Sequence, residues 1–97
     1  MPYITAAREI SSLIAKYSKT EILWIDTEIA DYKSPNPRLS LIQVLDDPED
    51  MTGDRVYLLD VLNQSGVIAD FIDQIMKNER IEKVFHNASY KKNAENP

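Results

Sequence analysis

Two carboxylates, Asp26 and Glu28, have a spacing that suits metal chemistry, because they directly follow the apolar run at residues 22–25. In an extended strand, residues two apart point to the same face and lie about 7 Å from one another. Two oxygen ligands arranged in this way suit a hard cation such as Mg²⁺ or Mn²⁺. Asp47 and Glu49 have the same spacing in a turn-rich stretch, so an ordinary pair of solvated carboxylates is the alternative interpretation.

Hydrophobic periodicity predicts the elements that must position these acids. Apolar residues at helical spacing predict two amphipathic helices, at residues 5–17 and 68–76, with Thr5 and Ser65 as their N-caps. Short apolar runs predict four strands, at residues 22–25, 39–45, 56–59 and 83–86. The order helix, three strands, helix, strand implies a mixed sheet with packed helices and a crossover before the last strand.

The composition is that of a small soluble domain. The 97 residues have a net charge of −5, which argues against a protein whose main task is non-specific binding to phosphate backbones. The chain has no cysteine, so it has neither a disulfide framework nor a thiolate metal site. No apolar run approaches the roughly 20 residues of a membrane span, and the amino terminus is not a secretory signal. We expect a cytoplasmic protein without a membrane partner.

A pattern wider than the acid pair runs through residues 23–28, 37–44, 56–60 and 83–90. Asp26 and Glu28 form an Asp-x-Glu motif after an apolar strand, and Asn87 precedes an aromatic residue, Tyr90, near the end of the chain. In order and spacing, these segments resemble the ribonuclease D-like branch of the DEDD 3′–5′ exonuclease family. The resemblance implies an α/β fold, a ribonuclease H-like mixed sheet with flanking helices, whose first three strands are antiparallel.

The same resemblance implies hydrolysis of nucleic-acid 3′ ends by two divalent cations, Mg²⁺ or Mn²⁺, that four acidic residues hold. Asp26 would contact both cations and Glu28 the cation nearer the attacking water, so these two are the expected catalytic and metal-binding residues. Asn87 and Tyr90 match positions that contact the substrate strand, and the Thr27 backbone is expected to face the terminal nucleotide. From the residues alone, Asn87 is equally a turn residue and Tyr90 equally a packing aromatic.

The sequence departs from the family pattern after Tyr90. The family has an aspartate at the next position, whereas this chain has Lys91, followed by Lys92, and it ends at Pro97 before the third motif. Two carboxylates cannot fix two cations about 3.5–4 Å apart. We therefore expect a partial, C-terminally truncated exonuclease domain over residues 1–90 and a polar tail over residues 91–97, inactive as this chain alone.

Three functions remain open at this point. The chain is a piece of a 3′–5′ exonuclease that is active when completed, a non-catalytic module that binds nucleic acid or protein through the same fold, or the product of a decayed gene. A gene truncation, a frame shift and the loss of residues after Tyr90 are the possible origins. Because an uncovered sheet exposes apolar surface and strand edges, we expect the chain to form a homo-oligomer or to be completed by another polypeptide.

Overall fold

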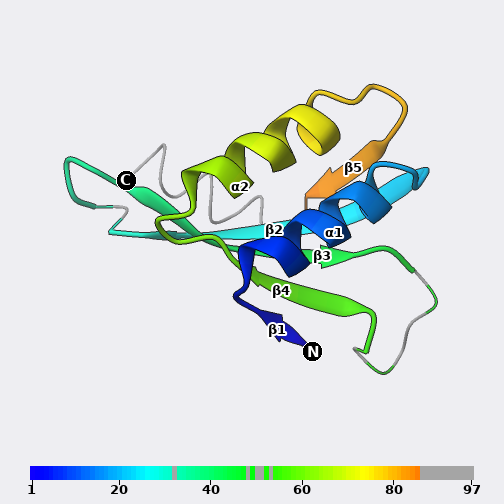
Figure 1. Cartoon of the computed structure of the whole chain (residues 1–97), viewed down its shortest axis with the longest axis horizontal. Helices are drawn as coiled ribbons and strands as arrows, with labels where there is room; N and C mark the ends of the chain where they lie inside the picture. Colours follow the sequence, from blue (N-terminus) through cyan, green and yellow to red (C-terminus); the bar gives the residue numbers. More distant parts are fainter. Residues whose placement is uncertain (32, 48, 50–51, 53, 86–97) are drawn as a thin grey trace.

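A computed structural model describes residues 1–31, 33–47, 49, 52 and 54–85 of the chain. Figure 1 shows its elements, which follow one another as β1 (Tyr3–Ile4), α1 (Ala7–Tyr17), β2 (Ile22–Ala30), β3 (Arg38–Leu45), β4 (Val56–Asp60), α2 (Ser65–Phe71), the π-helical turn η1 (Ile72–Met76) and β5 (Glu82–Phe85). No helix among the described residues is both long and apolar enough to cross a membrane.

The five strands form one mixed sheet in the order β1-β4-β3-β2-β5. β2, β3 and β4 are antiparallel neighbours, whereas β1 runs parallel to β4 and β5 runs parallel to β2. α2 and η1 carry the chain from β4 across to β5, on the far side of β2. The predicted mixed sheet, its three antiparallel strands and the final crossover are therefore confirmed.

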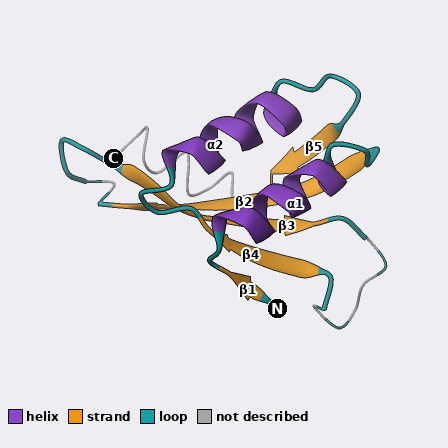
Figure 2. Ribbon diagram, viewed as in Figure 1, coloured by secondary structure: helices purple, strands orange, loops and turns teal. Residues whose placement is uncertain are grey.

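Both helices pack on one face of the sheet, where the hydrophobic core lies (Figures 1 and 2). Alternate residues of the long strands point to this face, as the period of two along a strand requires. Burial of each aliphatic side chain contributes roughly 1.5–3 kcal/mol to folding. The buried cluster comprises Ile10, Ile14, Tyr17, Leu23, Ile25, Ile42, Val44, Leu59, Val61, Val67, Phe71, Ile75 and Ile81.

The starts of both helices differ from the sequence-based expectation. The N-cap residues are Ala6 and Gln64, and neither makes a side-chain capping bond. The amide of Gln64 instead donates to the carbonyl oxygens of Thr5, at 3.1 Å, and Asp60, at 2.6 Å. This side chain joins the two chain segments that lead into the helices, an arrangement that no local capping rule predicts.

Trp24 belongs to the apolar run of residues 22–25 but not to the buried core. Leu23 and Ile25 point to the helices, so Trp24, between them, points to the opposite face and is half-buried there. The short strand β1 was not predicted at all, because two residues show no periodicity. It forms by pairing Tyr3 and Ile4 with β4.

The opposite face of the sheet has no helix of the described residues packed on it, and we call it the open face. Strand register assigns its members, because residues paired across neighbouring strands point to the same side. Most of these side chains are half-buried. They include Tyr3, Trp24, Asp26, Glu28, Leu41, Gln43, Leu45, Val56, Leu58, Asp60 and Val84.

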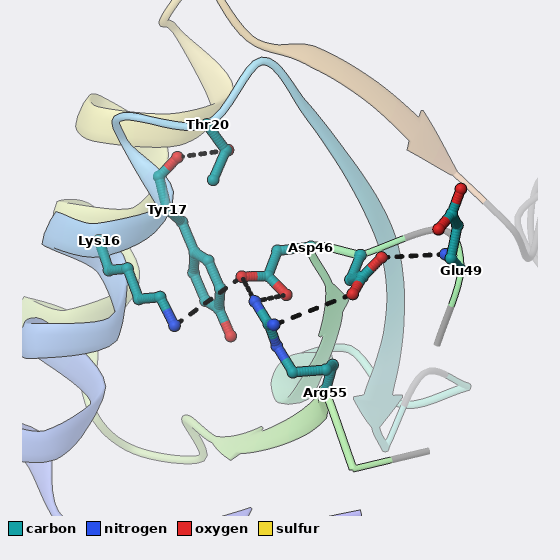
Figure 3. A network of polar contacts seen from close by, with 7 residues as sticks. Lys16, Tyr17, Thr20, Asp46, Glu49 and Arg55 are labelled. Atoms are coloured by element: carbon teal, nitrogen blue, oxygen red, sulfur yellow. Dashed lines mark hydrogen bonds and ion pairs between the residues drawn. The ribbon is translucent and has the colours of Figure 1, made fainter. Parts of the chain in front are cut away.

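An ion-pair network joins α1 to the β3–β4 hairpin (Figure 3). The carboxylate of Asp46, only 6% exposed, accepts two hydrogen bonds from Arg55, at 2.9 and 3.0 Å. The ammonium group of Lys16 lies 3.9 Å from the same carboxylate. The Tyr17 ring is buried beside this group, so the network fixes the helix against the hairpin.

Candidate metal and nucleic-acid site

Asp26 and Glu28 lie on the same side of β2, as the sequence predicted. Asp26 pairs with Gln43 of β3 and Glu28 pairs with Leu41, in an unbroken antiparallel register. Strand β2 continues to Ala30, however, so the two acids lie within the strand and do not close it. The extension arises because β3 supplies hydrogen-bonding partners beyond Glu28, and sequence periodicity does not reveal such partners.

One irregularity follows the acid pair within the sheet. The described pairing of β5 with β2 runs as far as Phe85, which is in register with Ile25, the residue before Asp26. A register shift follows Glu28, where Ser40 is the extra residue and its hydroxyl donates to the Glu28 carbonyl oxygen at 3.0 Å. A β-bulge bends its strand. The hairpin therefore bends directly after the acid pair.

Asp26 lines a cavity of about 290 Å³ on the open face. Its other lining residues include Trp24, Gln43, Leu45 and Val56. The Oδ1 atom of Asp26 is inaccessible to solvent and has no hydrogen-bond partner among the described residues. A buried carboxylate oxygen without a donor costs free energy, so this atom favours a cation or a donor that the described residues do not supply.

Asp60 lies across the sheet from Glu28, with Leu41 between them. Two strand spacings, about 10 Å, separate their backbones. The Tyr3 hydroxyl donates to Asp60 Oδ2 at 2.7 Å, and this hydrogen bond raises the pKa of Tyr3 above its ordinary value. Asp60 Oδ1 accepts from the Leu62 amide at 3.2 Å. Asp60 therefore has a structural role.

Thr27 points to the helix side of the sheet, away from the two acids. Its side chain lines a second cavity, of about 190 Å³, between β2 and the helical segment, with Leu39, Met76 and Phe85 among its other lining residues. The predicted contact between the Thr27 backbone and a terminal nucleotide stays a prediction. Asn87, Tyr90, Lys91 and Lys92 lie outside the described residues, so their expected roles also stay predictions.

The chemistry of Asp26 and Glu28 fits part of a metal site. Carboxylate oxygens on one strand face are the ligands that Mg²⁺ and Mn²⁺ prefer, and the unpartnered Asp26 oxygen is available to a cation. Within the described parts of the chain, no group of three or more His, Cys, Asp or Glu side chains is placed to hold a metal ion. The described residues therefore supply two ligands and do not form a complete two-cation site.

Gln43 was not singled out by sequence reasoning, although it shares the cavity with Asp26. The signal was present, because Gln43 is a polar residue within the apolar run of residues 41–45. Its placement beside Asp26 depends on the register between β2 and β3, which the sequence did not indicate.

Residues 1–90 match the sequence family of the 3′–5′ exonuclease domain. Ribonuclease D of Zymomonas mobilis is 33% identical over 85 residues, a region that covers 88% of this chain and 20% of that protein. The chain thus spans about a fifth of the length of this relative.

Two solved structures have a similar fold. The catalytic core of RRP6 from Trypanosoma brucei has a TM-score of 0.67 and 19% identity, over 93% of this chain and 23% of that chain. Trypanosoma brucei RNase D in complex with RNA U12 has a TM-score of 0.57 and 19% identity, over 89% of this chain and 30% of that chain.

The sheet order, the helices on one face and the acid pair on the central strand define the class of protein. It is an α/β protein with the ribonuclease H-like fold of exonuclease cores. The chain belongs to the 3′–5′ exonuclease domain family and resembles its ribonuclease D members.

Proposed function

We propose that these residues are part of a domain that removes nucleotides from nucleic-acid 3′ ends and that Asp26 and Glu28 bind its divalent cations. The observation that carries this proposal is the solvent-inaccessible, unpartnered Oδ1 atom of Asp26, on the same strand face as Glu28. When bound, Mg²⁺ or Mn²⁺ lowers the pKa of the attacking water and stabilises the leaving oxygen. The protein's contribution is to orient carboxylates on a rigid central strand.

RNA is the substrate class that the comparisons favour. The family member from Trypanosoma brucei, RNase D, has been solved with RNA U12 bound, and its fold matches 89% of this chain. Asn87 and Tyr90 remain the expected contacts to the substrate strand near its 3′ end, and the Thr27 backbone remains the expected contact to the terminal nucleotide.

Cleavage needs more carboxylates than these residues supply. A two-cation site requires ligands on both sides of each ion, and Asp26 and Glu28 provide only one side. The position expected to hold an aspartate is Lys91. We infer that the missing ligands come from further polypeptide, either of the same protein or of a partner, and that residues 1–97 alone do not cut.

A non-catalytic module that binds nucleic acid or protein is the second candidate. The limited ligand set among the described residues and the lysine at position 91 favour it. The two candidates make different predictions. The exonuclease proposal requires that Asp26 binds a divalent cation, whereas the module needs only the open face or the basic tail.

Isothermal titration calorimetry, which measures the affinity of the 97-residue chain for Mn²⁺, tests the exonuclease proposal. Two carboxylates should bind Mn²⁺ weakly, with a dissociation constant on the order of 1 mM. Asp26→Asn should abolish this binding. Asp47→Asn, in the other Asp-x-Glu pair, is the matched control and should leave it unchanged. If Asp26→Asn binds Mn²⁺ as tightly as the parent chain, the metal assignment is wrong.

A fluorescent single-stranded RNA oligonucleotide with Mn²⁺ separates the two candidates further. We expect no ladder of shortened products from the chain alone. A ladder that disappears in Asp26→Ala would disprove the inferred lack of activity and would establish the exonuclease. Tight RNA binding without Mn²⁺ binding would support the module instead.

A further inference from the structure

Arg38, the first residue of β3, places a positive charge on the same side of the sheet as the acid pair. Its register partner is Ala30, two residues after Glu28 on β2, and the extra residue of the bulge belongs to β3 alone. Glu28, Ala30 and Arg38 therefore point to the open face. Within the described strands, the only other lysine or arginine is Lys83, which points to the helix side.

Two hydrogen bonds hold the guanidinium group of Arg38. It donates to Asp31 Oδ2 at 2.9 Å and to Asn63 Oδ1 at 3.0 Å. Asp31 directly follows β2, and Asn63 lies in the connection between β4 and α2. The Arg38 side chain is nevertheless 49% exposed, and arginine has five N–H donors. A planar guanidinium group that is held in place and still exposed is pre-organised to bind an oxyanion.

The open face needs a positive charge if a nucleic-acid strand is to lie on it. The carboxylates of Asp26, Glu28 and Asp60 are on this face, and the chain has a net charge of −5. These charges repel a phosphodiester backbone. Divalent cations at the acid pair would offset the charge of the phosphate that they contact. The neighbouring phosphates of the same strand need another partner.

Arg38 is close enough to the acid pair to be that partner. Ala30 lies about 7 Å along β2 from Glu28, and Arg38 lies one strand spacing, about 5 Å, from Ala30. The backbones of Glu28 and Arg38 are therefore about 9 Å apart. Guanidinium groups form bidentate hydrogen bonds with phosphate oxygens. The exposed ion pair with Asp31 is no obstacle, because such pairs contribute little to stability.

We propose that Arg38 binds a backbone phosphate of the RNA strand whose 3′ end reaches Asp26 and Glu28. This inference deepens the proposed function, on which the identity of the strand rests. A bound strand exchanges the ion pair between Arg38 and Asp31 for one between Arg38 and phosphate, while Asn63 keeps the guanidinium group in position.

Fluorescence anisotropy of a single-stranded oligoribonucleotide, labelled at its 5′ end, tests the contact in the full chain. EDTA removes divalent cations, so the measurement does not depend on the metal site. Arg38→Gln should weaken binding about tenfold at low salt. It should also make the slope of log affinity against log salt concentration shallower by about 0.7, the value for one phosphate contact on a single strand.

Arg80→Gln is the matched control for the loss of charge. Arg80 is exposed and precedes β5, at the end of the sheet where β2 begins, whereas Arg38 lies at the end where β2 finishes. Its substitution should change RNA affinity much less. Equal losses in the two variants, or a parent chain that does not bind the oligoribonucleotide, would overturn the proposal.

Asp31→Asn separates phosphate binding from a purely structural role of Arg38. Asparagine tolerates the left-handed backbone of Asp31, whose φ is 56°. Loss of the competing carboxylate should tighten RNA binding about threefold more than Asp73→Asn does, which removes an equally exposed charge from η1. If Arg38 only joins two turns, Asp31→Asn should weaken RNA binding as Arg38→Gln does, and that result would contradict the proposal.

Arg38→Lys tests the charge itself. Lysine keeps the positive charge but loses the planar group, so the salt slope should stay that of the parent chain while the affinity falls between those of the parent and Arg38→Gln. A lysine variant with the affinity and the slope of Arg38→Gln would show that the charge does not contact phosphate.

Failure of the proposed function would look different from failure of this inference. If the parent chain does not bind Mn²⁺ but Arg38→Gln weakens RNA binding, the exonuclease assignment fails and the phosphate contact stands. If Mn²⁺ binds at Asp26 but Arg38→Gln leaves RNA affinity unchanged, the metal site stands and the phosphate contact is wrong.

Discussion

Tyr17 places a polar atom in the core. The residue is 1% exposed, and its hydroxyl is shielded from solvent with no hydrogen-bond partner among the described residues. The pKa of Tyr17 is raised above its ordinary value of 10.0. Burial of the hydroxyl is the main cause, and the negative charge of the nearby Asp46 carboxylate adds to it. The ring contributes to packing, whereas the hydroxyl has no described partner to offset its desolvation.

Tyr17→Phe should therefore leave the free energy of unfolding unchanged or raise it by up to about 1 kcal/mol, because it removes an unpaired buried hydroxyl. Urea unfolding at pH 7 measures this. Tyr3→Phe is the control and should lower stability, because the Tyr3 hydroxyl donates to Asp60. A loss of more than about 1 kcal/mol in Tyr17→Phe would mean that the hydroxyl has a partner outside the described residues.

The raised pKa of Tyr17 also sets a pH dependence. The folded protein holds the proton more tightly than the unfolded chain, so this contribution to stability is complete below about pH 10 and is lost as the pH rises through the folded pKa. Unfolding free energies measured from pH 8 upward should fall above pH 10 in the parent chain. They should fall less in Tyr17→Phe.

Asp46 is the carboxylate on which the network in Figure 3 depends. Asp46→Ala should destabilise the protein by about 1–2 kcal/mol, because it removes two charge-assisted hydrogen bonds to Arg55 from a shielded position. Thermal unfolding measures this. Asp73→Ala is the matched control. Asp73 forms an ion pair with Lys77 in which both side chains are exposed, so the pair should contribute at most about 0.5 kcal/mol to the free energy of unfolding. Equal losses in the two variants would contradict the structural role of Asp46.

At the scale of elements, β4 shows how strand alternation divides the molecule. Leu59 is fully buried on the helix side, and its neighbour Leu58 is half-buried on the open face. Both residues pair with β3 on one side and with β1 on the other, so the same two strands flank each. Substituting each leucine in turn therefore compares how much side-chain burial on each face of the sheet contributes to stability.

Leu59→Ala should cost about 2–5 kcal/mol, because it leaves a cavity in the core. Leu58→Ala serves as its matched control, since the substitution is the same and only the face differs. It should cost less than half as much, because Leu58 already contacts solvent. Urea unfolding of both variants makes the comparison. Equal losses would show that the open face is as well covered as the core.

At the scale of the molecule, one buried cluster joins both helices to the sheet. A domain with a single core unfolds in one cooperative step, with an enthalpy of about 60–80 kcal/mol for 100 residues. Circular dichroism and the fluorescence of Trp24, the only tryptophan, should therefore give the same midpoint. An earlier fluorescence transition would show that the open face loses its structure separately from the core.

Local sequence patterns determined most of the architecture. The long strands and both helices were predictable, because hydrophobic periodicity is a local property, whereas the antiparallel arrangement of β2, β3 and β4 was expected only from the family resemblance. The placement of Asp26 and Glu28 on one face followed from the period of two along a strand.

Only the tertiary structure decided the features that depend on partners distant in the sequence. The placement of Trp24 on the open face, Gln43 beside Asp26 and the bulge at Ser40 all follow from strand register. The network of Lys16, Asp46 and Arg55 unites residues of separate elements. These features were not predictable, because register and packing are set by contacts between segments, whereas sequence patterns report only the preferences within each segment.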